Sequence, residues 1–171
     1  MKKIALTLII ITSIAANARN TSSIKALFIY QFTRMIEWPI ETKKGMFRIG
    51  VLGSFDMYKE ISDATLGRNV GVQNIEVMNI MDISQLNLTN YHILVIGDNL
   101  CNQYRINEIN AKLKGTSTIT ITLKDNYLNN KIAIGFKKEG EQFSYCYSLL
   151  LIKNKGLQIS KDFISLGEKF Q

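Results

Sequence analysis

Residues 47–53 read FRIGVLG, an apolar run of β-prone residues that ends at a glycine. This pattern is typical of a β-strand. Asp56 can cap a short helix that continues to Thr65. A strand followed directly by a helix is the repeating unit of α/β proteins, in which helices cover a mostly parallel sheet.

The same alternation continues along the chain. Residues 75–78 and 92–96 are the next predicted strands, and Gly97 ends the second of them. A helix is expected at residues 99–114, because apolar residues recur there at helical spacing and a glycine follows. Residues 117–122 alternate threonine with isoleucine, as in a strand with two unlike faces.

The pattern changes in the last part of the chain. Residues 131–136 and 142–147 are strand-like runs separated by a polar loop that ends in glycine, which predicts a hairpin. Ser148 can cap a helix over residues 149–155, and Ser160 can cap a last helix after a short extended piece. We therefore predict an α/β fold with a mostly parallel sheet, helices on both faces and an antiparallel C-terminal hairpin.

Residues 1–18 have the three parts of a secretory signal peptide. Two lysines supply its positive start, an apolar stretch follows over residues 4–14, and residues 16–18 (Ala-Asn-Ala) have the small side chains that a signal peptidase reads. The apolar run is shorter than the roughly 20 residues that span a bilayer, which argues against an uncleaved anchor. We expect an exported protein whose residues 19–171 fold as one domain.

The formal net charge is +7, and the lysines and arginines are scattered along the chain. A nucleic-acid-binding protein is expected to gather them in a stripe with interleaved aromatic residues, so this distribution and export both argue against nucleic acid as a partner. One interpretation is a solvated surface with a mild basic bias. The other is attraction to an acidic partner or an anionic membrane surface, where charge speeds encounter.

No residues suggest a catalytic, metal or cofactor site. His92 is the single histidine, and no carboxylate or cysteine lies around it at the spacing of metal ligands, so we expect a structural role. Cys101 lies near the start of a predicted helix, where the pKa of a thiol can be lowered, but no positioned base is visible. Cys101 and Cys146 could form a disulfide in an oxidising compartment or remain two separate thiols.

Two strand ends could form a ligand crevice. Gly53-Ser54 and Gly97-Asp98 each lie between a predicted strand and a predicted helix, and ligands of open α/β sheets bind outside the carboxyl ends of the strands. A helix N-terminus at this edge can bind phosphate. A dinucleotide fingerprint requires three glycines, however, and only Gly53 is present there. The alternative is that each glycine simply ends its strand.

The most specific signal is a predicted helix that begins near Ser22 or Ser23 and ends before Pro39. Its apolar residues at helical spacing are Ile24, Leu27, Phe28, Phe32, Met35 and Ile36. The helix has further apolar residues on its other sides, so it carries more apolar surface than one contact with the sheet can bury. Surplus apolar surface on a protein often marks an interface. We therefore expect the outer side, around Tyr30 and Arg34, to take part in self-association or partner contact. The alternative is a helix buried on both sides.

Residues 24–39, IKALFIYQFTRMIEWP, resemble the opening segment of the YfiR family, in which a lysine-alanine-x-phenylalanine helix ends in a glutamate-tryptophan-proline turn. Residues 47–53 are similar to the family's first strand, residues 92–97 (HILVIG) to its HVLFIG strand, and residues 156–160 (GLQIS) to its closing segment. The ordered set covers essentially the whole chain after the signal peptide. The motif residues, with structural or interface roles, are Phe28, Phe32, Glu37, Trp38, Pro39, Gly53, Gly97, Gly156 and Ser160.

The sequence departs from the family pattern at three places. Tyr91 stands where the family usually has a cysteine, so the family's disulfide pattern is not carried over. Asn126-Tyr127 and Asn129-Asn130 stand where the family favours a glycine-phenylalanine pair and then two glycines. Asparagine tolerates a left-handed backbone better than most residues, so we expect the turn to persist. Ser148 replaces the usual asparagine before a helix and is another competent N-cap.

The resemblance implies a periplasmic regulator with no catalytic activity and no cofactor. Members of the family inhibit an inner-membrane diguanylate cyclase by binding its periplasmic sensor region. An outer-membrane lipoprotein can sequester the repressor, which releases cyclic diguanylate synthesis and biofilm formation. The resemblance thus implies these two partners, and a homodimer is a further expectation. The alternative function is a periplasmic small-ligand sensor that uses the crevice beside Gly53 and Gly97.

Overall fold

The computed structural model describes residues 21–87, 90–127, 131–140 and 142–170. The predicted signal peptide, residues 1–18, lies outside this part of the chain, as do the first two residues expected to follow it. Among the residues that are described, no helix is both long enough and apolar enough to cross a membrane.

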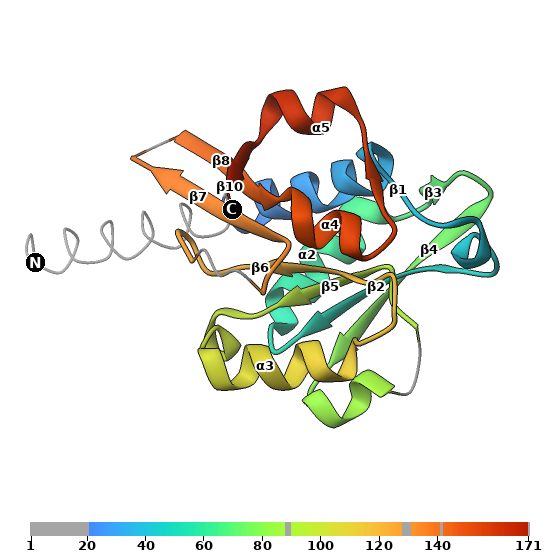
Figure 1. Cartoon of the computed structure of the whole chain (residues 1–171), viewed down its shortest axis with the longest axis horizontal. Coiled ribbons are helices and arrows are strands. Elements are labelled where there is room, and N and C mark those ends of the chain that lie inside the picture. The colour runs from blue at the N-terminus through green and yellow to red at the C-terminus, as the bar shows by residue number, and fades with distance from the viewer. Residues whose placement is uncertain (1–20, 88–89, 128–130, 141, 171) are drawn as a thin grey trace, which may run out of the picture.

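Strands and helices alternate along the chain (Figure 1). A helix over residues 21–35 precedes the labelled elements. The strands are β1 (Ile36–Glu37), β2 (Phe47–Leu52), β3 (Asn69–Val70), β4 (Gln73–Ile80), β5 (Ile93–Ile96), β6 (Ile119–Thr122), β7 (Ile134–Glu139), β8 (Gln142–Ser148), β9 (Gln158–Ile159) and β10 (Glu168–Phe170). The helices are α2 (Phe55–Thr65), α3 (Gln103–Lys112), α4 (Leu149–Asn154) and α5 (Lys161–Leu166), with short 3-10 turns η1 (Ile40–Thr42), η2 (Ile83–Asn87) and η3 (Asp98–Leu100).

Eight strands form one sheet in the order β10-β8-β7-β6-β5-β2-β4-β3. The neighbours β4, β2, β5, β6 and β7 run parallel to one another. β8 is antiparallel to β7, β3 is antiparallel to β4, and β10 returns parallel to β8. The predicted mostly parallel sheet with an antiparallel hairpin is confirmed.

Helices cover both faces of this sheet (Figure 1). On one face Phe47 and Val51 of β2 belong to a core that includes side chains of the first helix, α2, α4 and α5. On the other face Leu52 of β2 packs in a second core with Ile106 and Ile109 of α3. Successive side chains of a strand point to opposite faces, so one apolar strand supplies both cores.

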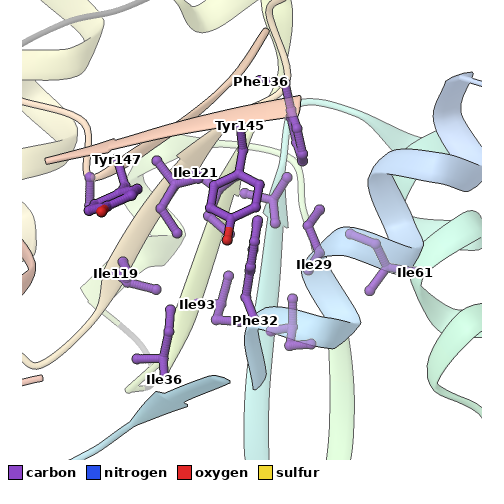
Figure 2. Packing of buried hydrophobic residues seen from close by; sticks show 14 of the residues in the cluster. Ile29, Phe32, Ile36, Ile61, Ile93, Ile119, Ile121, Phe136, Tyr145 and Tyr147 are labelled. Atoms are coloured by element: carbon purple, nitrogen blue, oxygen red, sulfur yellow. The ribbon is translucent and has the colours of Figure 1, made fainter. Parts of the chain in front are cut away.

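An aromatic cluster joins the first helix to the C-terminal hairpin. The ring centroid of Phe32 lies 4.8 Å from that of Tyr145 and 6.5 Å from that of Phe136, and Figure 2 shows these rings in the larger core. The hydroxyl of Tyr145 donates a hydrogen bond to the carbonyl oxygen of Phe163 over 2.7 Å. The cluster therefore holds the helix, the hairpin and α5 together.

The first helix buries a different face from the predicted one. Phe32 is buried as expected, and Ile36, expected in the helix, is buried as the first residue of β1. Leu27 is 52% exposed and Phe28 is half-buried. Ile29 is fully buried instead. The helix contributes to a core that also contains side chains of α2 and α5, so it is covered on more than its sheet side. Helical spacing alone does not identify which of several apolar stripes faces the sheet.

Short polar side chains cap the helices, each accepting a hydrogen bond from a backbone N–H three residues further on. The caps are Ser54 for α2, Asn102 for α3, Ser148 for α4 and Ser160 for α5. The predictions for Ser148 and Ser160 are confirmed. Asp56 is not the cap of α2, because the chain leaves β2 directly into a helix and Asp56 lies in its first turn. The helix predicted from Asn99 begins only at Gln103, because a separate 3-10 turn precedes it.

Several elements differ in length from the predicted ones. The residues Lys137 to Glu139, expected in the hairpin loop, continue β7. β4 is longer than the predicted strand, and β10 was not predicted. Asn126 adopts φ +57°, and its amide both accepts from the backbone N–H of Lys138 and donates to its carbonyl oxygen, each over 3.2 Å. The left-handed conformation expected of asparagine is therefore confirmed at Asn126, while Asn129 and Asn130 lie outside the described residues.

Candidate functional site

The two ends of the motif set meet in a small second sheet. β1, which follows the first helix, pairs antiparallel with β9. The backbone N–H of Ser160 donates to the carbonyl oxygen of Met35 over 2.9 Å. Gly156 has φ +73°, a left-handed conformation that favours glycine, and it packs beside the Pro39 ring. The early and late motif segments therefore form one structural unit.

Trp38 anchors this unit to the main sheet. It is 4% exposed, and its ring meets that of Phe47 edge-on at 4.9 Å. Its indole Nε1 donates a hydrogen bond to the carbonyl oxygen of His92 over 3.3 Å. The ring of His92 stacks on Phe47 at 4.3 Å. Three aromatic rings from distant segments are thus packed in one place.

His92 acts here as a structural group. Its Nδ1 accepts a hydrogen bond from the backbone N–H of Arg48 over 3.1 Å, which requires the proton to be on Nε2. Nε2 lies 3.0 Å from the carbonyl oxygen of Thr42 and donates to it. Burial lowers the pKa of His92, so the neutral ring that this geometry needs is the stable form. The histidine ties the η1 turn to β2.

An open groove of about 620 Å³ lies beside this anchor, between the end of the first helix, β1 and the β3–β4 hairpin. Residues from the helix and the segment after it that line the groove include Tyr30, Thr33, Arg34, Glu37 and Trp38. The hairpin contributes Asn69, Val70, Gly71, Val72 and Gln73. Four of the residues singled out from the sequence, Tyr30, Arg34, Glu37 and Trp38, therefore face one groove.

Two arginines lie at this place: Arg34 lines the groove, and Arg68 lies against the ring of Tyr30, which also lines it. The guanidinium of Arg68 lies 4.4 Å from the centre of the Tyr30 ring. A hydrogen bond from Arg68 lowers the pKa of the Tyr30 hydroxyl, and Arg34 adds to the effect. Glu37 is paired with Lys43 over 2.8 Å. In the part of the chain that the structure describes, no carboxylate lies within ion-pairing distance of Arg34 or Arg68.

A helical wheel predicts Tyr30 on the outer side of the first helix, but in the structure Tyr30 is buried. It is 7% exposed, because the groove wall and the Arg68 side chain cover its ring. The accessible groups at this place are the guanidiniums of Arg34 and Arg68 and the exposed Val72. Sequence reasoning does not find Arg68 or Val72, since both come from a hairpin far along the chain. The signal that marks this hairpin is the pair of glycines at residues 67 and 71, both in left-handed conformations.

A second hollow, of about 380 Å³, lies at the carboxyl ends of β2 and β5. Gly53, Ser54 and Asp98 line it together with Lys25. Gly97 packs directly on Gly53, since a Cβ there would lie 2.7 Å from the Gly53 carbonyl oxygen. The structure therefore brings the two strand-end turns side by side.

The charges of this hollow do not favour a phosphate. Asp56 and Asp98 both line it. Its cation, Lys25, is already paired with Asp125 over 2.7 Å and also contacts the carbonyl oxygen of Leu123. Neither carboxylate forms an ion pair with any of the described residues, and both oppose an anion, so a neutral or cationic ligand fits the hollow better.

The described residues contain no group of three or more histidine, cysteine or acidic side chains that could hold a metal ion. Cys101 and Cys146 are both buried, and each is a free thiol. Burial raises the pKa of both thiols, which is opposite to the lowering considered for Cys101 from its place near a helix start. Cys101 packs its sulfur 2.8 Å from the Thr122 hydroxyl.

The sequence profile of the YfiR/HmsC-like family matches residues 22–168. The match extends over most of the chain and includes every motif segment, so the protein belongs to this family. A search among curated proteins finds no matching relative. Proteins of the YfiR/HmsC-like family are regulatory proteins of cyclic diguanylate signalling and are not known as enzymes.

Proposed function

We propose that this protein is a periplasmic repressor that binds the periplasmic sensor region of an inner-membrane diguanylate cyclase. By holding the cyclase inactive it controls cyclic diguanylate synthesis and biofilm formation. Family membership over residues 22–168 supports the regulatory role. The observation that carries the proposal is the joining of the motif segments into one structural unit beside an open groove that Arg34 lines.

The make-up of the groove favours protein contact over catalysis. Aromatic residues and arginine are enriched in the energetically important parts of protein interfaces. Tyr30, Trp38 and Arg34 all line this groove. The histidine near it is occupied on both ring nitrogens and held neutral, so it is not available as a base.

Export and release complete the proposed cycle. The signal peptide at residues 1–18 would direct the chain to the periplasm, where the sensor region of the cyclase lies. An outer-membrane lipoprotein would sequester the repressor and thereby free the cyclase. Removal of residues 1–18, which contain Lys2 and Lys3, would reduce the net charge from +7 to +5. This positive charge would speed encounter with an acidic surface on either partner.

A binding experiment tests the proposal directly. The mature chain is immobilised and exposed to the purified periplasmic sensor regions of the diguanylate cyclases of the same cell. We expect one of them to bind saturably, and binding to weaken as salt is raised. A cytoplasmic domain with the same net charge as the sensor region serves as the control for non-specific electrostatic attraction. Binding to none of the sensor regions would contradict the proposal.

A second candidate function is a small-ligand sensor. The observation in its favour is the hollow of about 380 Å³ that Gly53, Ser54 and Asp98 form at the carboxyl ends of the strands. A thermal-shift screen against amino acids, amines and nucleotides tests it. A ligand at one hundred times its Kd adds about 2.7 kcal/mol of stability, which is enough to raise the unfolding midpoint visibly. The charges of the hollow predict that amines succeed and nucleotides fail.

A further inference from the structure

The guanidiniums of Arg34, in the groove, and Arg68, beside it, have no acidic partner within the described part of the chain. Arg34 lies one turn after Tyr30 on the first helix and lines the groove with it, and the guanidinium of Arg68, just before β3, lies 4.4 Å from the centre of the Tyr30 ring. Both arginine side chains are exposed. Unpaired guanidiniums that converge on one place form a ready site for a carboxylate, which they can bind in a planar, bidentate manner.

Apolar groups adjoin this pair of charges. Val72, at the tip of the β3–β4 hairpin, is 93% exposed, and Val70 lines the groove beside it. β3 is an edge strand, so its far side is open within the described residues. A side chain entering the groove would meet cations at the rim and apolar surface next to them. This combination suits an acidic residue that is flanked by apolar residues in a protein segment.

We propose that the groove binds an acidic side chain of the partner protein, with its carboxylate at Arg34 and Arg68 and an apolar neighbour against Val70 and Val72. The proposal rests on the function proposed above and names the chemistry by which the sensor region is recognised. Charge complementarity selects this occupant, because the carboxylate of the groove itself, Glu37, is already neutralised by Lys43. An anionic membrane would instead require cations spread over a flat face rather than gathered at the edge of a groove.

The first test does not involve the cyclase. Trp38 is the only tryptophan of the chain and lines the groove, so its fluorescence reports occupancy. The probes are acetyl-Val-Glu-Val-amide and its neutral counterpart acetyl-Val-Gln-Val-amide. We expect the glutamate peptide to saturate with a Kd on the order of 1 mM and the glutamine peptide to bind about tenfold more weakly. Equal responses to the two peptides, or no response to either, would overturn the proposal.

Charge-removing variants then identify the residues. The double variant Arg34→Gln/Arg68→Gln is expected to lose the preference for the glutamate peptide. Arg105→Gln, which removes an exposed arginine from α3, is the matched control and is expected to keep it. Circular dichroism checks that each variant is folded. If the double variant retains the full preference, the carboxylate site is not at these arginines and the proposal is wrong.

The second test uses the sensor region found by the binding experiment. The double variant is expected to bind it at least tenfold more weakly than either the unaltered chain or Arg105→Gln. Undiminished binding would overturn the acidic-residue proposal and leave the repressor function intact. Binding of the peptide without binding of any sensor region would overturn the repressor function instead. If the groove instead binds a second copy of this chain, the chain will dimerise and the double variant will not. That result would also overturn the choice of partner.

Discussion

The indole Nε1 of Trp38 donates a hydrogen bond to the carbonyl oxygen of His92 across 3.3 Å. The bond connects the exit of the first helix to the start of β5, in the middle of the sheet. The same carbonyl oxygen accepts from the backbone N–H of Ile119, which belongs to the next strand. A single carbonyl thus joins the motif turn to two parallel strands.

Two replacements of Trp38 should separate the contribution of its ring to the free energy of unfolding from the contribution of its hydrogen bond. Trp38→Ala removes a buried ring and is expected to lower the free energy of unfolding by about 3–5 kcal/mol. Trp38→Phe keeps most of the ring, and the His92 carbonyl keeps its bond from Ile119, so a loss of about 1–2 kcal/mol is expected. Urea unfolding followed by circular dichroism measures both. Tyr104→Ala, at a 73% exposed position, is the control, and an equal loss there would contradict the anchoring role.

Stability should depend on pH through His92. Burial lowers the pKa of this histidine in the folded protein, whereas in the unfolded chain the pKa is about 6.5. As the pH falls below about 6.5 the unfolded chain takes up a proton before the folded protein does, so the free energy of unfolding decreases. The loss is at most about 1.4 kcal/mol per pH unit and continues down to the lowered pKa.

The test of this pH dependence compares two proteins between pH 5 and 7.5. His92→Gln keeps an acceptor for the Arg48 N–H and a donor for the Thr42 carbonyl but cannot be protonated. Because His92 is the only histidine, the variant should lose most of the slope just below pH 6.5. An unchanged slope in the variant would show that other groups cause it.

Two neighbouring positions of the first helix should respond differently to truncation. The ring of Phe28 lies 5.7 Å from Tyr145 and 6.2 Å from Phe136, so Phe28→Ala is expected to cost about 3 kcal/mol. Leu27 is 52% exposed, so Leu27→Ala should change stability by no more than about 0.5 kcal/mol. Urea unfolding of the two variants gives the comparison. Similar losses at both positions would mean that the helix is rotated relative to the face described here.

Both cysteines should behave as protected thiols. They are buried and free, and burial raises the pKa of each, so little thiolate forms near pH 7. Ellman's reagent is expected to react slowly with the native protein and to detect both thiols at once in denaturant. A protein with no reactive thiol in denaturant, and a mass lower by two hydrogens, would reveal a disulfide between Cys101 and Cys146.

The central part of the sheet is predictable from the sequence for a physical reason. Strands β2 and β5 are buried on both faces, so they are continuous apolar runs, and each is followed by a glycine. The caps Ser148 and Ser160 are also predictable, since each stands directly before an apolar helical segment. The short extended piece expected before Ser160 is β9. Strands β1 and β3 are not predictable, because two residues are too few to show a period.

The candidate site is only half predictable. Arg34 and Trp38 belong to a distinctive segment, but the opposite wall of the groove comes from a hairpin with no motif of its own. The burial of Tyr30 depends on Arg68, a contact between residues far apart in sequence. No periodicity within the helix reports such a contact. The sequence therefore predicts Tyr30 to be exposed, whereas in the structure Arg34 and Arg68 are the exposed residues at this place.

The most direct test of the repressor function is the cellular level of cyclic diguanylate, measured by mass spectrometry. Three strains are compared: one lacking this protein, the same strain with the gene restored, and one lacking both the protein and the cyclase that it binds. Loss of the protein should raise cyclic diguanylate several-fold, restoration should return it to the original level, and the double deletion should show no rise. An unchanged level in the first strain, with the cyclase expressed, would contradict the repressor function.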